Sequence, residues 1–203
     1  MSKYQPVVLE KEEGNRVSMD LPTRFFKDRV IFLTGVIEDG TAESIIQQLL
    51  YLDQQSHEPI TLYINSPGGY CTEGIGILNT MECIQSPIHA IGYGMVCSMG
   101  ATILCRCDKR GALEGTEIMF HQISGGAYGN IQDMNLALKV NNEINEYLLR
   151  KIAEGCDKTV KQLKKDMARD MTLFPEDAIK YGAIDYVIPS SNAEGKRKFK
   201  LKK

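Results

Sequence analysis

The chain has 203 residues and a formal net charge of −2, with 43% hydrophobic and 25% charged residues. These values are ordinary for a globular protein and exclude a mostly disordered or fibrous chain. No stretch reaches the roughly 18 apolar residues of a membrane-spanning helix, and the first residues are polar rather than an apolar signal core. We therefore expect an unexported, cytoplasmic protein with no membrane partner.

Charge is distributed unevenly along the chain. Six of the last eight residues are basic, and without them the chain holds 18 basic and 26 acidic residues, a charge of −8. An acidic body argues against nucleic acid as the main ligand. We expect residues 191–203 to form a basic, solubilising tail and the polar residues 1–20 to form an N-terminal arm.

The six cysteines lack the context of a disulfide framework, because the chain is not small and we expect it to be unexported. Cys105 and Cys107 are the only close pair, and no second Cys/His pair follows at zinc-site spacing. We expect reduced, mostly buried thiols and no metal site.

Apolar runs and helical apolar stripes alternate over residues 21–190, which we interpret as one domain. Expected strands cover residues 29–33, 60–64, 88–93, 117–120 and 186–188. Expected helices run from a cap at Thr41 to 52, from a cap at Thr72 to 84, over 98–104, 131–152 and 160–168, and from Pro175 to 181. This alternation predicts an α/β fold with helices covering the sheet and a ligand site at the carboxyl ends of strands.

A serine lies where one expected strand turns into an expected helix. Ser98 is placed near the free N–H groups of a helix N-terminus, which can stabilise an oxyanion during acyl transfer. The pattern is not the G-x-S-x-G elbow, because Val96 occupies the first glycine position. This segment alone leaves two interpretations open, a nucleophile and a simple helix cap.

A serine nucleophile needs a base, and the base needs an orienting carboxylate. His121 follows the strand at 117–120, so we expect its imidazole at the same sheet edge. Spacing does not choose among the downstream carboxylates, which are Asp133, Asp166, Asp170, Asp177 and Asp185.

Glycine pairs follow two of the expected strands, at 68–69 and 125–126. Glycine lets backbone N–H groups approach a ligand closely, but such pairs can also simply form turns.

Several motifs together resemble the proteolytic subunits of the Clp protease family, over about Leu21 to Ile188. The matching motifs are Val30-Ile31-Phe32-Leu33-Thr34-Gly35, Tyr63-Ile64-Asn65-Ser66-Pro67-Gly68-Gly69, Ser98-Met99-Gly100-Ala101, Ile118-Met119, His121-Gln122 and Arg169-Asp170. They occur in the family's order. None of them would be specific alone, but the combination is.

The resemblance implies a serine endopeptidase with a crotonase-like α/β core and a projecting strand-helix handle at about 124–155. It implies Ser98 as nucleophile, His121 as base and Asp170 as orienting carboxylate. It also implies oxyanion donors at the backbone N–H groups of Gly68 and Met99. Residues Gly125, Gly126 and Ala127 are expected to pair with the backbone of a substrate strand.

The resemblance further implies an assembly and a partner. Family subunits form heptameric rings that stack as a tetradecamer, and an AAA+ unfoldase ATPase feeds unfolded protein substrates into the chamber. The chain has no G-x-x-x-x-G-K-[ST] motif, so we assign nucleotide chemistry to that partner and expect no cofactor here. Residues 1–20 would then form an axial loop that is partly processed.

The sequence also departs from the family pattern near the expected site. Val96 and Cys97 replace small residues before the nucleophile, and Ile123 replaces the usual proline after His121-Gln122. These changes are typical of a divergent paralogue. They keep a second interpretation open, a catalytically weak or inactive ring subunit that needs a second proteolytic subunit type. A crotonase-like acyl-CoA enzyme and a cysteine hydrolase using Cys97 are further alternatives.

Overall fold

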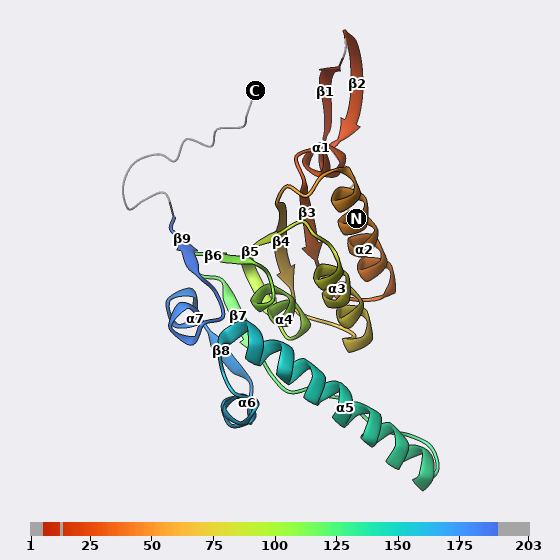
Figure 1. The fold of residues 1–203 in the computed structure, drawn as a ribbon, viewed down its shortest axis with the longest axis vertical. Helices are drawn as coiled ribbons and strands as arrows, with labels where there is room; N and C mark the ends of the chain where they lie inside the picture. The colour runs from red at the N-terminus through yellow and green to blue at the C-terminus, as the bar shows by residue number, and fades with distance from the viewer. Residues whose placement is uncertain (1–5, 13, 191–203) are drawn as a thin grey trace.

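A seven-stranded sheet, parallel except at one edge, forms the centre of the computed structural model, which describes residues 6–12 and 14–190. Five strands lie in the order β3 (Val30–Thr34), β4 (Ile60–Ser66), β5 (Ile88–Cys97), β6 (Lys109–Leu113) and β9 (Tyr186–Ile188). Figure 1 shows an N-terminal hairpin at one end of the molecule and a long helix leaving the other end.

The central strand β5 has two neighbours on the same side. Its first half pairs with β6, at His89 to Gly92, and its second half pairs in parallel with β7 (Glu117–Phe120), at Met95 to Cys97. The short strand β8 (Met171–Leu173) then pairs antiparallel with β7. The end of β5 is thereby brought beside the ends of β7 and β8.

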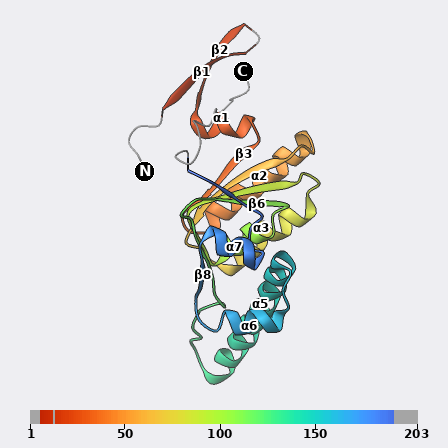
Figure 2. The ribbon, with the colours of Figure 1, turned by 90° about the vertical axis from the view of Figure 1, so that its left-hand side faces the viewer.

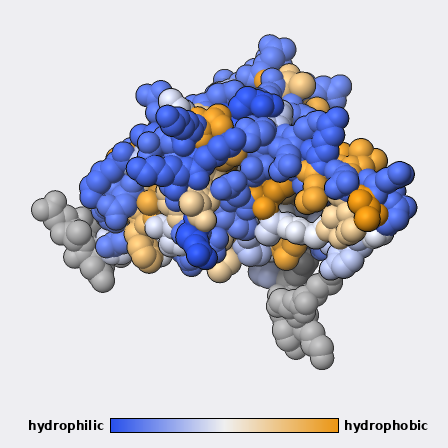
Figure 3. All heavy atoms as spheres, turned by 90° about the horizontal axis from the view of Figure 1, so that it is seen from below, coloured by the Kyte–Doolittle hydropathy of each residue, from blue (hydrophilic) through white to orange (hydrophobic). Residues whose placement is uncertain are grey.

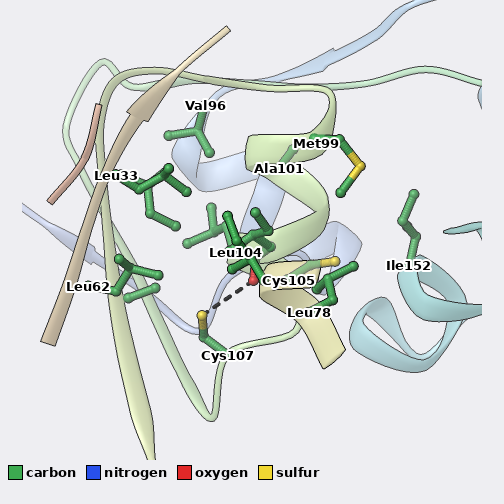
Figure 4. Packing of buried hydrophobic residues seen from close by; sticks show 14 of the residues in the cluster. Leu33, Leu62, Leu78, Val96, Met99, Ala101, Leu104, Cys105, Cys107 and Ile152 are labelled. Carbon is green, nitrogen blue, oxygen red and sulfur yellow. Dashed lines mark hydrogen bonds between the residues drawn. The ribbon is translucent and has the colours of Figure 1, made fainter. Parts of the chain in front are cut away.

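Helices cover the sheet because alternate strand side chains are apolar and buried. The even positions of β4, from Ile60 to Ser66, are all buried, as the two-residue period of a strand requires. Against them pack α2 (Asp39–Gln55), α3 (Cys71–Cys83) and α4 (Met99–Cys105). Every residue of α4 is buried, and Figure 4 shows its side chains between the strands and Ile152 of the long helix.

The remaining elements surround this core. They are α1 (Leu21–Lys27), α5 (Ile131–Cys156), α6 (Val160–Asp166) and α7 (Pro175–Tyr181). The base of α5 is buried at Leu148, Leu149 and Ile152, whereas its first half projects from the body (Figures 1 and 2). Asn130 caps α5 by accepting hydrogen bonds from the N–H groups of Gln132 and Asp133.

The N-terminal arm is a β-hairpin of β1 (Val7–Glu12) and β2 (Asn15–Asp20), which Figure 2 shows standing away from the sheet. Asp20 ends the hairpin and caps α1 by accepting from the N–H of Thr23. Arg24 of α1 pairs with Glu10 of β1, so the hairpin is tied to the body at its base.

The α/β architecture expected from the sequence is confirmed, with several corrections. Thr41 and Thr72 lie inside helices that begin at Asp39 and Cys71, so neither threonine is a cap. The hairpin, β6 and β8 were not predicted, and β5 continues to Cys97 because β7 supplies new partners beyond Tyr93. The handle lacks its expected strand, since residues 121–128 form no regular element. The basic tail at 191–203 lies outside the described residues.

Two further expectations can be compared with the described residues. All six cysteines are free, and four of them are buried. Across residues 6–12 and 14–190, no helix is long and apolar enough to cross a membrane.

Candidate active site

Ser98 lies at the junction of β5 and α4 in a strained backbone conformation. Its φ of 56° is in the left-handed region, which residues other than glycine seldom adopt. Its N–H donates to the carbonyl oxygen of Met119 at 2.7 Å, and its carbonyl accepts from the N–H of Thr102 at 3.0 Å. Although Ser98 occupies the N-cap position of α4, its side chain makes no capping bond, so the capping interpretation is wrong.

The hydroxyl of Ser98 instead faces His121. The distance from Ser98 Oγ to His121 Nε2 is 2.7 Å. The register of the sheet explains this approach. Cys97 of β5 pairs with Met119 of β7, and Ser98 and His121 follow these two residues closely in the chain. In the tautomer with a proton on Nδ1, the hydroxyl donates to Nε2, which is the arrangement of a nucleophile and its base.

Asp170 is the carboxylate nearest to His121, on the Nδ1 side of its imidazole. Phe120 of β7 pairs with Met171 of β8, so His121 and Asp170 are the next residues beyond that antiparallel pair. Asp170 Oδ1 lies 3.8 Å from His121 Nδ1, and the Asp170 side chain is 72% exposed. The carboxylate is therefore beside the imidazole but not within ordinary hydrogen-bond distance.

The other candidate carboxylates bind elsewhere. Asp133 accepts from Asn130 at the start of α5, Asp166 from Gln162 and Tyr181, Asp177 from Lys180, and Asp185 from Arg110. Of the five candidates, Asp170 is the one that lies beside His121.

Gly68 approaches Ser98 from the end of β4. Its φ is +97°, and a Cβ placed on it would lie 2.5 Å from Ser98 Cβ and 3.0 Å from Ser98 Oγ. No side chain fits at this position, so backbone reaches the serine directly. The N–H of Gly68 donates to Ser66 Oγ at 3.1 Å. Met99 is the first residue of α4, where an N–H has no acceptor within the helix.

The chain is similar to known proteins over most of its length. The family model described as Clp protease matches residues 12–191. The chain belongs to the Clp protease family. It is 38% identical over 191 residues to a protein of Streptococcus pyogenes serotype M5 (strain Manfredo) and to one of Streptococcus equi subsp. equi (strain 4047). Both are named ATP-dependent Clp protease proteolytic subunit, and the matches cover 92% of this chain and 97% of each relative.

Membership of the Clp protease family makes the chain a peptidase by descent, and its mixed α/β fold with a parallel sheet is the crotonase-like fold expected of that family. Within the part of the chain that the structure describes, no group of three or more His, Cys, Asp or Glu side chains is arranged to hold a metal ion.

The segment after His121 runs beside α5 and lines a cavity of about 370 Å³ with it. Gly125 and Gly126 border this cavity, whereas Ala127 does not. Sequence analysis missed Cys71 and Asn145, which also line it from α3 and α5. Nothing in the local sequence marks either residue, since both reach the cavity only through the packing of separate helices.

Cys97 is adjacent to Ser98 but differs from it in environment. Its side chain is buried, and this burial raises the pKa of the thiol, with a further contribution from Glu117. A thiol that resists ionisation is a poor nucleophile. The geometry therefore favours the hydroxyl of Ser98 over the thiol of Cys97.

Proposed function

We propose that this chain is the proteolytic subunit of an ATP-dependent Clp protease and hydrolyses unfolded polypeptides to short peptides as a serine endopeptidase. The 2.7 Å contact between Ser98 Oγ and His121 Nε2 carries this proposal. It joins a serine on a strained strand-helix junction to a histidine at the end of the neighbouring strand, and Asp170 lies beyond that histidine.

The chemistry is a two-step acyl transfer. Ser98 Oγ attacks the scissile carbonyl carbon while His121 Nε2 accepts the hydroxyl proton, and the proton then passes to the leaving amine. Water hydrolyses the resulting ester with the same base. Asp170 stabilises the imidazolium form of His121 and orients its ring.

The oxyanion of the tetrahedral intermediate would be stabilised by the N–H groups of Gly68 and Met99. Gly68 is close to Ser98 because it has no side chain. Its N–H donates to Ser66 Oγ in this structure. A bound substrate would therefore share that donor with Ser66 or take it over.

Substrate binding is assigned to the backbone of Gly125, Gly126 and Ala127. Added to an extended peptide as a neighbouring strand, this segment would form main-chain hydrogen bonds that do not depend on substrate side chains. We assign a side chain of the substrate to the cavity of about 370 Å³ that this segment borders.

An assembly follows from the family and from exposed apolar surface. Leu136, Leu138 and Val140 are exposed on the projecting part of α5, and Figure 3 shows apolar patches on the face seen from below. We propose that these surfaces pack in stacked heptameric rings, with the N-terminal arm expected at residues 1–20 near the axial entrance; residues 1–5 and 13 of that arm lie outside the described residues. The relatives' names include "ATP-dependent", and we assign the ATP to an AAA+ unfoldase in the cytoplasm.

The alternative function is a catalytically weak or inactive ring subunit that works with a second proteolytic subunit type. The 3.8 Å separation and 72% exposure of Asp170 favour it, because the base is not firmly oriented. Altered residues beside the site, Val96 and Cys97, point the same way.

Fluorophosphonate labelling tests the proposed function directly. The purified protein should be labelled at Ser98 and should hydrolyse peptides, and Ser98→Ala should lose both. Cys97→Ala, which changes the neighbouring thiol only, should retain both. Native mass spectrometry of the same samples reports ring size. Rings without labelling or hydrolysis would support the alternative, and hydrolysis that survives in Ser98→Ala would exclude the Ser98 mechanism.

A further inference from the structure

The segment that follows His121 is held to the body in an unusual way. Among the described residues, residues 122–128 make no backbone–backbone hydrogen bond, although they lie between a strand and the long helix. The backbone of His121 is held by strand β7 on its N-terminal side only. The contacts that hold the next two residues therefore determine the position of the backbone on its C-terminal side.

Side-chain amides supply this anchor. Asn145 Oδ1, from the middle of α5, accepts the N–H of Ile123 at 3.1 Å. Asn145 Nδ2 donates to Gln122 Oε1 at 3.3 Å, and Gln122 Nε2 donates to the carbonyl oxygen of Met167 at 3.3 Å. Asn145 is half-buried, so these contacts are partly shielded from water.

The direction of the network is fixed by its first bond. A backbone N–H can only donate, so the Ile123 N–H requires the oxygen of Asn145, which turns the amide nitrogen towards Gln122. The oxygen of Gln122 then faces Asn145, and its nitrogen is left for Met167. Each amide has one orientation that satisfies all three contacts.

The network also reaches the carboxylate side of the site. Met167 is the C-cap residue of α6, three positions before Asp170. Asn145 and Gln122 therefore connect the segment after the base to the segment before the carboxylate, and both are connected to the handle helix.

The residue at position 123 explains why an acceptor is present. Ile123 has a backbone N–H close to the proposed site, and leaving that donor unpaired would be costly. Asn145 is the side chain that accepts it.

We propose that Asn145 is a positioning residue for the base, and that its amide compensates for the Ile123 N–H by holding residues 121–123 against α5. This rests on the proposed function, because it gives Asn145 a role in the reaction of Ser98 and His121. The hydrogen bonds of Asn145 go to Gln122 and Ile123 rather than to Ser98 or His121, so it acts through those two residues.

The test combines two measurements on purified full-length protein. Hydrogen exchange of the peptide spanning residues 121–128 reports how firmly the segment is held, and the fluorophosphonate labelling rate at Ser98 reports the reactive geometry. In Asn145→Leu we expect faster exchange and a fall of about tenfold in labelling rate and kcat, with KM changed less, because small misplacements of reacting groups lower rates strongly. Asn145→Asp keeps the acceptor but loses the donor, so it should lie between Asn145→Leu and wild type.

A double-mutant cycle isolates the bond to Ile123. Ile123→Pro removes the N–H. Asn145→Leu should therefore lower the labelling rate at Ser98 by a smaller factor in the Ile123→Pro protein than in wild type. Gln47→Leu is the control, since it changes an exposed amide of α2, outside the segment and outside the projecting part of α5, and should leave both measurements unchanged.

Three results would each overturn the proposal. The first is a hydrogen-exchange rate of residues 121–128 in Asn145→Leu equal to that of wild type. The others are an equal loss of labelling rate in the two backgrounds, and a variant that loses thermal stability but no labelling rate. Failure of the proposed function has a different signature, which is wild-type protein that is not labelled at Ser98. The exchange measurement still decides in that case whether Asn145 holds the segment.

Discussion

On the Ser98 side of the site, backbone segments approach so closely that no side chain fits between them. Gly68 contacts Ser98 directly, and a Cβ on the next residue, Gly69, would overlap the backbone of Ile37. On the His121 side, the contacts come from the three-residue strand β8, the amides of Gln122 and Asn145, and an exposed carboxylate. The nucleophile is thus placed by main chain and the base by side chains.

This difference indicates which half of the site can change without loss of the fold. Backbone contacts in a packed core have few alternative arrangements. Side-chain amides and an exposed carboxylate can be replaced or reoriented while the sheet stays intact. The fold should therefore tolerate changes on the His121 side, such as those at Gln122 or Asp170, more readily than changes at Gly68 or Gly69.

Gly68→Ala should have the largest effect, because it disturbs the close main-chain packing that positions Ser98. The added Cβ would lie 2.5 Å from Ser98 Cβ, and the φ of +97° disfavours alanine. Displacement of one oxyanion donor lowers kcat by about 10²–10³-fold, and we expect at least this loss in peptide hydrolysis. A labelling rate within twofold of wild type would contradict the close packing of this side.

Asp170→Asn should have a smaller effect, because the carboxylate is 3.8 Å from His121 and largely exposed. Where the corresponding hydrogen bond is tight, this change lowers kcat by about 10⁴-fold, and we expect a loss of about 10–100-fold. Steady-state hydrolysis measures it, with Asp166→Asn as a carboxylate control outside the site. A loss as large as that of Gly68→Ala would show that the base is firmly oriented during turnover.

The sequence predicted the Ser98 side better than the His121 side for a physical reason. Glycines and a serine at strand ends are local signals, because close backbone approach requires glycine at fixed positions. The position of Asp170 depends on the short strand β8, which the sequence did not predict. Only its antiparallel pairing with β7 brings Asp170 beside His121, and such pairing is non-local.

The same reason explains the other errors. The strand β6 was missed because Lys109 and Arg110 give it a polar start. The hairpin was missed because β1 has three apolar residues followed by three charged ones, and so lacks the alternation typical of a strand. Asn145 was missed because an asparagine on a long helix has no distinctive pattern. Its role is visible only once α5 lies against the segment after His121.

Asp185→Asn should separate stability from reactivity, because its contacts lie away from Ser98. Burial alone would raise the pKa of Asp185, but the hydrogen bonds from Arg110 outweigh it and lower that pKa. The stabilisation is therefore present above the unfolded-state pKa of about 3.9 and is lost as the pH falls through the folded-state pKa.

We expect Asp185→Asn to lower Tm at pH 7 by about 2–4 °C, the shift that about 1 kcal/mol gives in a chain of this size. The difference from wild type should shrink below about pH 4 as the wild-type carboxyl is protonated. Labelling at Ser98 should be unchanged. A labelling loss without a Tm change would mean that this pair belongs to the site after all.

Gly125→Ala should have the smallest effect and tests the proposed substrate segment. A Cβ at this position has no heavy atom within 4 Å, and the backbone does not adopt positive φ, so stability should not change. If the segment binds peptides through its main chain, alanine retains those groups, and kcat/KM should stay within about twofold of wild type. Gly125→Pro removes the N–H, so it should raise KM while leaving labelling by a small fluorophosphonate unchanged. Equal KM values for the two variants would mean that this N–H does not bind substrate.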